Sequence, residues 1–94
     1  MQIANDVERG RLSAEVDGHE AELVYSRGNG RLTILHTGVP QAIGGRGVAG
    51  ALVQAALDYA RAEGLKVVPA CSYAAAYLQR HPQYADLVAG RGPG

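Results

Sequence analysis

A cluster of glycines stands directly before an apolar segment with helical periodicity. Gly44, Gly45 and Gly47 surround Arg46, and the apolar spacing predicts a helix over residues 48–63. The first N–H groups of a helix have no partner within it and lie at the positive end of its dipole. Glycines let a phosphate approach these groups, and Arg46 adds a charged hydrogen-bond donor. The cluster therefore predicts an anion site for a phosphate, in preference to a merely tight connection.

The same cluster contains a weak match to the dinucleotide-binding pattern GxGxxG, from Gly45 to Gly50. That pattern needs a parallel βαβ unit with an acidic residue near the end of its second strand. The segment 67–71 (Val-Val-Pro-Ala-Cys) has no acidic residue, and only hairpin strands precede the loop. A P-loop fails as well, because no Gly-Lys-Ser/Thr is present. A nucleotide-binding interaction domain is therefore the least favoured hypothesis.

The single cysteine, Cys71, lies between a predicted strand at 65–68, ended by Pro69, and a predicted helix at 72–80. A thiol at a helix N-terminus has a lowered pKa and a larger thiolate fraction. Free cysteine is also a common small core residue. Position alone therefore leaves two interpretations of Cys71 open, a reactive thiol and a core residue.

The elements that must position these groups begin with strands, because residues 10–37 alternate between apolar and polar. Asp17-Gly18 and Asn29-Gly30 are typical of two-residue hairpin turns. The first turn places Leu12 opposite Leu23, so that the apolar side chains of both strands share one face.

The second turn places Tyr25 opposite Ile34 and Leu23 opposite His36, which extends the same face. The pattern therefore predicts a three-stranded antiparallel meander, in which His36 is a hydrogen-bonded core histidine rather than a catalytic base. Val39-Pro40 ends the third strand, because proline removes a backbone donor.

The second half of the chain has helical spacing around one short strand. Gly64 follows the helix at 48–63 and suits its C-terminus, where a left-handed residue is common. The strand at 65–68 and the helix at 72–80 come next, and 84–88 is a last extended or helical segment. The order predicts an α/β (α+β) fold, an antiparallel three-stranded meander followed by loop, helix, strand and helix.

The chain of 94 residues is long enough for one hydrophobic core. We expect a single domain over residues 1–94, with its core at about 10–88 and a flexible tail at 89–94. An exposed sheet edge in so small a domain leaves a monomer and a homodimer both open.

Composition excludes several classes of partner. Nine basic and nine acidic residues give a net charge of +0, which disfavours nucleic acid. No apolar run approaches the ~20 residues of a membrane-spanning helix, and the first residues lack a signal-peptide pattern. One cysteine forms no internal disulfide, and no Cys/His cluster predicts a metal site. We therefore expect a cytoplasmic protein that binds neither metal nor membrane.

At the glycine cluster the chain resembles the GNAT N-acetyltransferase superfamily. The motif of that superfamily is Gln/Arg-x-x-Gly-x-Gly/Ala, between an antiparallel strand and a helix. On this sequence it covers Gly44 to Ala49, with Gly47 and Ala49 at the two small positions. Gly44 departs from the motif, because it stands where the superfamily has Gln or Arg.

A longer resemblance is to the minimal GNAT-like family of under about a hundred residues, which lacks the usual N-terminal helical region. Three segments carry it, on either side of the glycine cluster: His36–Pro40, Pro69–Tyr73 and Arg80–Tyr84. The resemblance covers roughly residues 10–88 and implies a mixed-sheet fold that binds acetyl-CoA.

The resemblance also implies a function, acetyl-CoA-dependent N-acetyltransfer to an unidentified primary amine. The alternative is a catalytically weak or inactive module of the same fold that binds coenzyme A. The residues implied to bind the cofactor are Val39, Gly44, Gly45, Arg46, Gly47, Val48, Ala49, Ser72 and Tyr73.

Cys71 and Tyr77 are the implied catalytic residues. The amine attacks the thioester directly, or Cys71 takes the acetyl group first as a nucleophile. Tyr77, or alternatively Tyr73, would protonate the departing thiolate.

Overall fold

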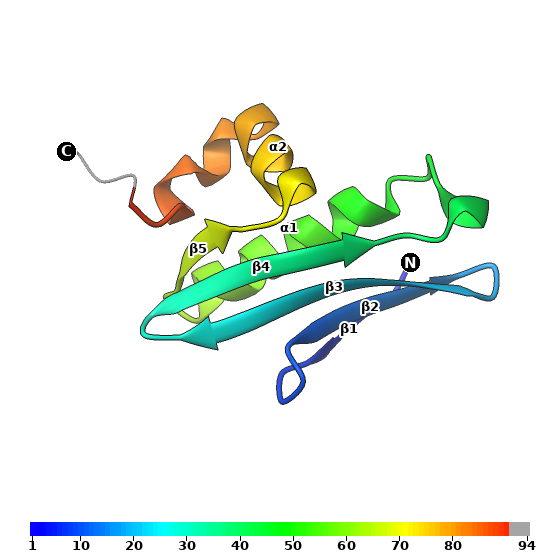
Figure 1. The fold of residues 1–94 in the computed structure, drawn as a ribbon, viewed down its shortest axis with the longest axis horizontal. Coiled ribbons are helices and arrows are strands. Elements are labelled where there is room, and N and C mark those ends of the chain that lie inside the picture. Colours follow the sequence, from blue (N-terminus) through cyan, green and yellow to red (C-terminus); the bar gives the residue numbers. More distant parts are fainter. Residues whose placement is uncertain (91–94) are drawn as a thin grey trace.

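The computed structural model describes residues 1–90 and contains a five-stranded sheet in the order β1-β2-β3-β4-β5 (Figure 1). Neighbouring strands are antiparallel from β1 to β4, and β5 is parallel to β4. The elements are β1 (Ile3–Asp6), β2 (Arg11–Val16), β3 (His19–Gly28), β4 (Arg31–Gly38), η1 (Gln41–Ile43), α1 (Val48–Ala62), β5 (Lys66–Pro69), α2 (Ser72–Arg80) and η2 (Pro82–Leu87). The predicted mixed α/β class and the order from meander to second helix are confirmed.

Both predicted hairpin turns form with the expected backbone. Asp17 and Asn29 have φ values of 51° and 55°, and the glycine after each is also at positive φ. These are the conformations that a type I′ turn requires. The first hairpin has the predicted register, because Leu12 lies opposite Leu23.

The second hairpin departs from prediction at its far end. Tyr25 lies opposite Ile34 as expected, but Val24 faces His36 and Leu23 faces Thr37. A β-bulge between Val24 and Tyr25 makes this shift, since one residue of β4 has no partner on β3. The predicted Leu23–His36 pair is therefore wrong.

Strand β1 was not predicted, and it extends the sheet before residue 10. Ile3 lies opposite Ala14 of β2, and Tyr25 donates a 2.7 Å hydrogen bond to the side-chain oxygen of Asn5. The sheet therefore begins before residue 10, and Ile3 packs against a core whose first buried residue is Leu12.

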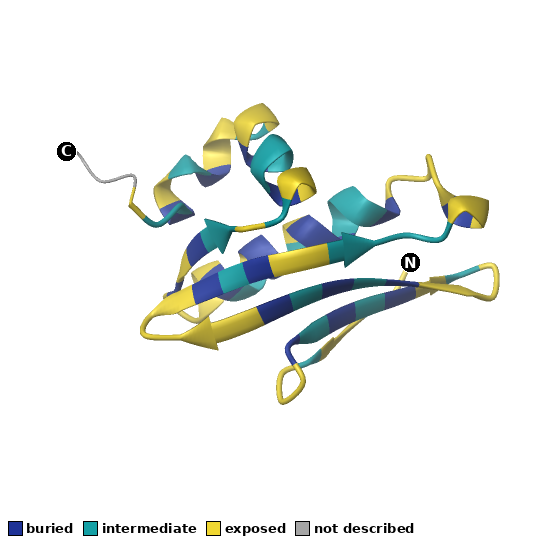
Figure 2. Ribbon diagram, viewed as in Figure 1, coloured by how far each residue is buried: buried dark blue, intermediate teal, exposed yellow. Residues whose placement is uncertain are grey.

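Helix α1 covers one face of the sheet and contributes six buried apolar residues to the core (Figure 1). Buried positions alternate along the central strands, as Figure 2 shows, because successive side chains point to opposite faces. The fully buried large side chains come from both layers: Leu23, Leu32, Ile34, Ile43, Leu52, Val53, Leu57 and Val67. One core thus fixes α1, and its first residue, against the sheet.

The end of the described chain is tied to β5. Val88 forms a parallel bridge with Val67, and the amide of Ala89 donates to the carbonyl of Val67 at 2.8 Å. Ala89 is therefore part of the fold, although a tail was predicted from residue 89. Residues 91–94 of that predicted tail lie outside the described part. None of the helices in residues 1–90 combines the length and apolar character needed to cross a membrane.

Candidate cofactor site and its neighbouring thiol

The glycine loop (Gly44–Gly47) leads directly into α1, and most of its backbone is not covered by side chains. Gly45 and Gly47 have φ values of 79° and 78°, a left-handed conformation that glycine adopts without strain. Gly47 is the N-cap of α1 and offers no side-chain acceptor, and the first turn of α1 contains no acidic residue. The first N–H groups of α1 therefore lack the partners that most helices provide.

A hollow of about 230 Å³ opens at this helix start and is called the loop hollow below. Its lining combines the end of the β4–η1 connection, the glycine loop, the first turn of α1 and one tyrosine of α2. The residues are Val39, Ile43, Gly44, Gly45, Gly47, Val48, Ala49 and Tyr73. The structure thus brings together all the predicted cofactor-binding residues except Arg46 and Ser72. Ile43 was missed, although it is an apolar residue directly before the glycines.

Arg46 belongs to the glycine loop but does not line the loop hollow. Its guanidinium instead forms an ion pair with Asp17, in the turn between β2 and β3. In this conformation the side chain of Arg46 is engaged elsewhere, and a contact between Arg46 and phosphate stays a prediction.

A larger hollow of about 630 Å³ lies along β1 and β2, away from the glycine loop. Among residues 1–90 its lining includes the carboxylates Glu15 and Glu20 and no basic residue. Two carboxylates repel a phosphate, so the smaller loop hollow is the better anion site.

Cys71 is the N-cap residue of α2, with an extended backbone conformation. Its sulfur lies 3.6 Å from the hydroxyl of Thr37, at the end of β4. Burial raises the pKa of the Cys71 thiol, but the nearby backbone amides of Ala74 and Tyr73 and the hydroxyl of Thr37 favour the thiolate and outweigh burial. Together they bring the pKa below the ordinary value. The core-residue interpretation is thus incomplete, because the thiol is partly exposed and its thiolate is stabilised.

Strands β4 and β5 part at the level of Cys71. Their pairing runs from Arg31–Lys66 to Ile34–Pro69, and the amide of Ala70 still donates to the carbonyl of Ile34. Beyond that point β4 continues to Gly38, while the segment after β5 leads into α2. The contact between Thr37 and Cys71 bridges the gap between the separated strands. Cys71 precedes Tyr73, which lines the loop hollow, by two residues.

A sequence model of the GCN5-related N-acetyl-transferase family matches residues 11–87. The chain belongs to this family. Protein NATD1 of Gallus gallus is 36% identical over 85 residues, which cover 87% of this chain and 77% of that protein. Protein NATD1 of Homo sapiens is 35% identical, with 87% of this chain and 75% of that protein covered.

A solved structure agrees with this assignment. The NMR solution structure of a GCN5-like protein from Staphylococcus aureus superposes with a TM-score of 0.74 at 30% identity. The match covers 93% of this chain and 86% of that chain. The fold is therefore that of a GCN5-related N-acetyltransferase, as the sequence predicted.

Within this GCN5-related domain, Tyr77 belongs to α2, and its ring faces Gly50 of α1. Its ring stacks on His81 at 3.8 Å between centroids, and the ring nitrogen Nδ1 of His81 lies 2.8 Å from the Tyr77 carbonyl. Burial, and then the neighbouring Tyr84, Tyr73 and Asp58, raise the pKa of Tyr77. The phenol therefore stays protonated, but no hydrogen bond among residues 1–90 joins it to Cys71. A role for Tyr77 as proton donor remains a prediction.

Gly50 is a further residue of the site that the sequence did not single out. A Cβ atom at Gly50 would lie 3.4 Å from the hydroxyl of Tyr73 and 3.6 Å from a ring carbon of Tyr77. These are ordinary van der Waals distances, so Gly50 faces Tyr73 and Tyr77 of α2 with room for a methyl group. The signal was present in the sequence, as a glycine inside an apolar helical pattern.

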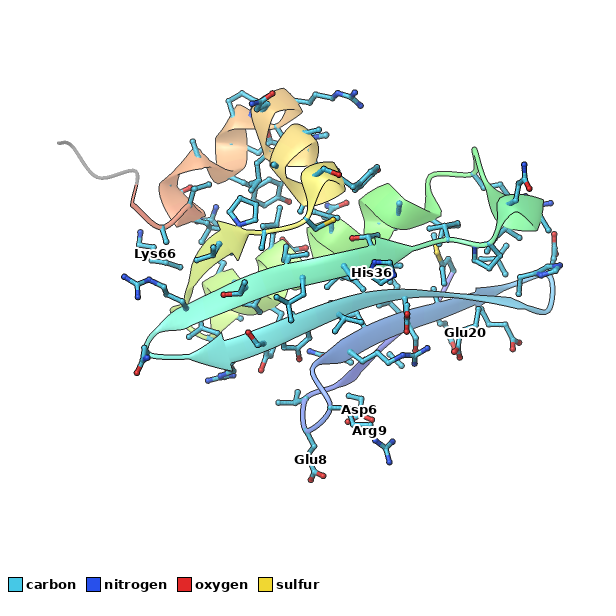
Figure 3. The ribbon with its side chains drawn as sticks, viewed as in Figure 1. Asp6, Glu8, Arg9, Glu20, His36 and Lys66 are labelled. Carbon is cyan, nitrogen blue, oxygen red and sulfur yellow. The ribbon has the colours of Figure 1, made fainter. Side chains whose placement is uncertain are left out.

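His36 is exposed, so the expected core histidine is wrong. The β-bulge places Val24 opposite His36, and 60% of the histidine side chain is accessible (Figure 3). Its Nε2 lies 4.0 Å from a carboxylate oxygen of Glu22, and a Cβ at Gly38 would lie only 2.9 Å from that nitrogen. The imidazole thus lies against Gly38, the last residue of β4, beyond the point where β4 and β5 separate.

Proposed function

We propose that the chain is an acetyl-CoA-dependent N-acetyltransferase that acts on a primary amine. Membership of the GCN5-related family supports acetyl transfer in general. The observation that carries the proposal is the uncapped start of α1, which opens into the loop hollow. Tyr73, which lines this hollow, follows Cys71 by two residues.

The residues of the loop hollow fit a diphosphate. Donors there are backbone N–H groups at the positive end of α1, and no carboxylate of the described residues lines the hollow. Tyr73 offers a flat apolar ring, 41% exposed, against which the neighbouring part of the cofactor would pack. Ser72 is exposed at the first position of α2, and its contact with the cofactor is part of the proposal. When bound, acetyl-CoA supplies the activated thioester carbonyl.

Removal of a proton from the amine needs an acceptor near the end of β4. His36 is exposed there, with Glu22 close to its ring, and is the proposed acceptor. Glu22 is itself held by Arg11, whose Nε lies 2.8 Å from the other carboxylate oxygen. The carboxylate is thus kept in place beside the imidazole.

Two routes for the acetyl group follow from the position of Cys71. In the first, the amine takes the group directly and Cys71 only lines the site. In the second, the Cys71 thiolate would attack the thioester carbonyl and release coenzyme A as its thiolate. The amine would then attack the acetyl-cysteine and release the Cys71 thiolate again. Thr37 positions the sulfur in both routes.

A second candidate function is a module that binds coenzyme A without efficient transfer. One observation favours it: Gly44 lacks the Gln or Arg side chain of the superfamily motif, so one phosphate contact is missing.

The deciding experiment treats the purified protein with coenzyme A and with acetyl-CoA. We expect coenzyme A to raise the midpoint of thermal unfolding, and acetyl-CoA with a panel of primary amines to release free thiol. A gain of about 42 Da on Cys71 would identify the covalent route. The variant Cys71→Ala should keep its affinity for coenzyme A. Binding without thiol release favours the second candidate, and no binding of coenzyme A refutes both.

A further inference from the structure

The glycine loop contains one side chain able to fix its position. Gly44, Gly45 and Gly47 contribute none, and two of these glycines are at positive φ. A chain with so many glycines has large conformational freedom when nothing holds it. Arg46 is the exception, and the contact it makes therefore decides how far the loop is ordered.

That contact joins the loop to a distant hairpin. The guanidinium of Arg46 pairs with the carboxylate of Asp17, although 29 residues separate them in sequence. Among residues 1–90 Asp17 is the one hydrogen-bond partner of the Arg46 side chain. The pair therefore connects the glycine loop with the end of the β2–β3 hairpin.

Asp17 is well suited as an anchor because its own position is fixed. It occupies a two-residue type I′ turn, and the strands on either side of the turn pair Val16 with His19. The other hairpin of the sheet has Asn29 at the equivalent turn position. Turn geometry is thus satisfied by an asparagine, and what aspartate adds at position 17 is a charge that faces Arg46.

We propose that Asp17 is a positioning residue of the cofactor site, which holds the glycine loop in its binding conformation through Arg46. The inference rests on the proposed function, because it concerns the affinity of the same loop for coenzyme A. An ordered loop has less conformational entropy to lose on binding, so its affinity is higher. The pair is half exposed, with accessible fractions of 50% and 65%, and its effect is accordingly modest.

The variant Asp17→Asn tests this directly, since it removes the charge and keeps the turn. Glu15→Gln is the matched control, because Glu15 is an exposed acid on the same hairpin and the same charge is lost. By calorimetry at low salt, we expect Asp17→Asn to bind coenzyme A about two- to fivefold more weakly, the range of an exposed ion pair. Arg46→Gln should weaken binding by at least as much, and the double variant should be no weaker than Arg46→Gln alone. Glu15→Gln should bind as the wild type does.

Hydrogen exchange supplies a readout that does not depend on coenzyme A. In the free protein, amides 44–48 should exchange faster in Asp17→Asn than in the control, with an unchanged thermal midpoint. High salt should reduce the difference, because exposed charges are screened. In turnover, KM for acetyl-CoA should rise while kcat stays constant.

Each outcome decides the proposal. Equal exchange at 44–48 in the two variants overturns it, and so does tighter binding by Asp17→Asn, which would mean that Asp17 withholds Arg46 from the phosphates. If the wild type fails to bind coenzyme A, the proposed function fails, and exchange alone then decides whether Asp17 orders the loop.

Discussion

A carboxylate at Ala49 should weaken cofactor binding while it strengthens the fold. Ala49 is the second residue of α1 and lines the loop hollow. The change is Ala49→Glu, and Ala49→Gln is its control, since the two side chains have almost the same size and differ in charge. The difference between the variants therefore isolates electrostatics from steric effects.

The two effects have opposite signs and different sizes. A negative charge in the first turn of a helix stabilises it by about 0.3–1 kcal/mol, because it meets the positive end of the dipole. At ~6 Å from a phosphate, the same charge is repelled by about 1–3 kcal/mol for effective dielectric constants from ~60 down to ~20. We therefore expect Ala49→Glu to bind coenzyme A about five- to 100-fold more weakly than Ala49→Gln, and to unfold at a higher temperature.

Calorimetric titration with coenzyme A and thermal unfolding of the free proteins measure the two quantities. Misfolding would lower both the affinity for coenzyme A and the midpoint of thermal unfolding. A lower affinity together with a higher midpoint therefore identifies the anion site. Equal affinities of two folded variants would refute the assignment of the diphosphate to the start of α1.

Three further expectations concern other parts of the site. Gly44 has φ of −65°, an ordinary value, so Gly44→Arg should bind coenzyme A about three- to tenfold more tightly than Gly44→Ala through a charge-assisted contact; equal affinities in calorimetry would contradict this. Thr37→Val should shift the iodoacetamide reactivity of Cys71 to higher pH, because the hydroxyl lowers the thiol pKa, whereas Thr37→Ser should not; identical pH profiles would exclude the role of Thr37. Gly50→Ala should stabilise the fold by up to about 1 kcal/mol in urea unfolding, since the new Cβ makes ordinary contacts with Tyr73; destabilisation would show that the helices cannot accept a methyl group.

The parts of the fold that the sequence predicts well are those under local control. Asp17-Gly18 and Asn29-Gly30 set their own turns, and Leu12 and Leu23 then face each other without reference to the rest of the chain. The helix at the glycine loop follows from its apolar spacing in the same way. Six of the predicted cofactor-binding residues meet at one hollow because they lie close together in sequence around the start of α1, and Tyr73 joins them from α2.

The features that the sequence did not predict depend on contacts between residues far apart in the chain. Strand β1 contains Asn5 and Asp6, which have low strand propensity, and it forms because β2 offers an open edge. The bulge that exposes His36 shifts the register within a strand pair, which alternation of residue types does not reveal. Arg46 finds its partner 29 residues earlier, so its local sequence suggested a phosphate contact instead.

The missing side-chain cap of α1 has a consequence for the durability of the whole domain. Substitution of a capping Ser, Thr, Asp or Asn by glycine sacrifices only a few tenths of a kcal/mol, so the uncapped Gly47 is a small loss to the free chain. An anion that satisfies the same amides adds to the free energy of unfolding in proportion to the logarithm of its concentration above Kd. In a domain this small, where the margin against unfolding is narrow, abundance of the ligand would set the lifetime of the folded protein as well as its occupancy.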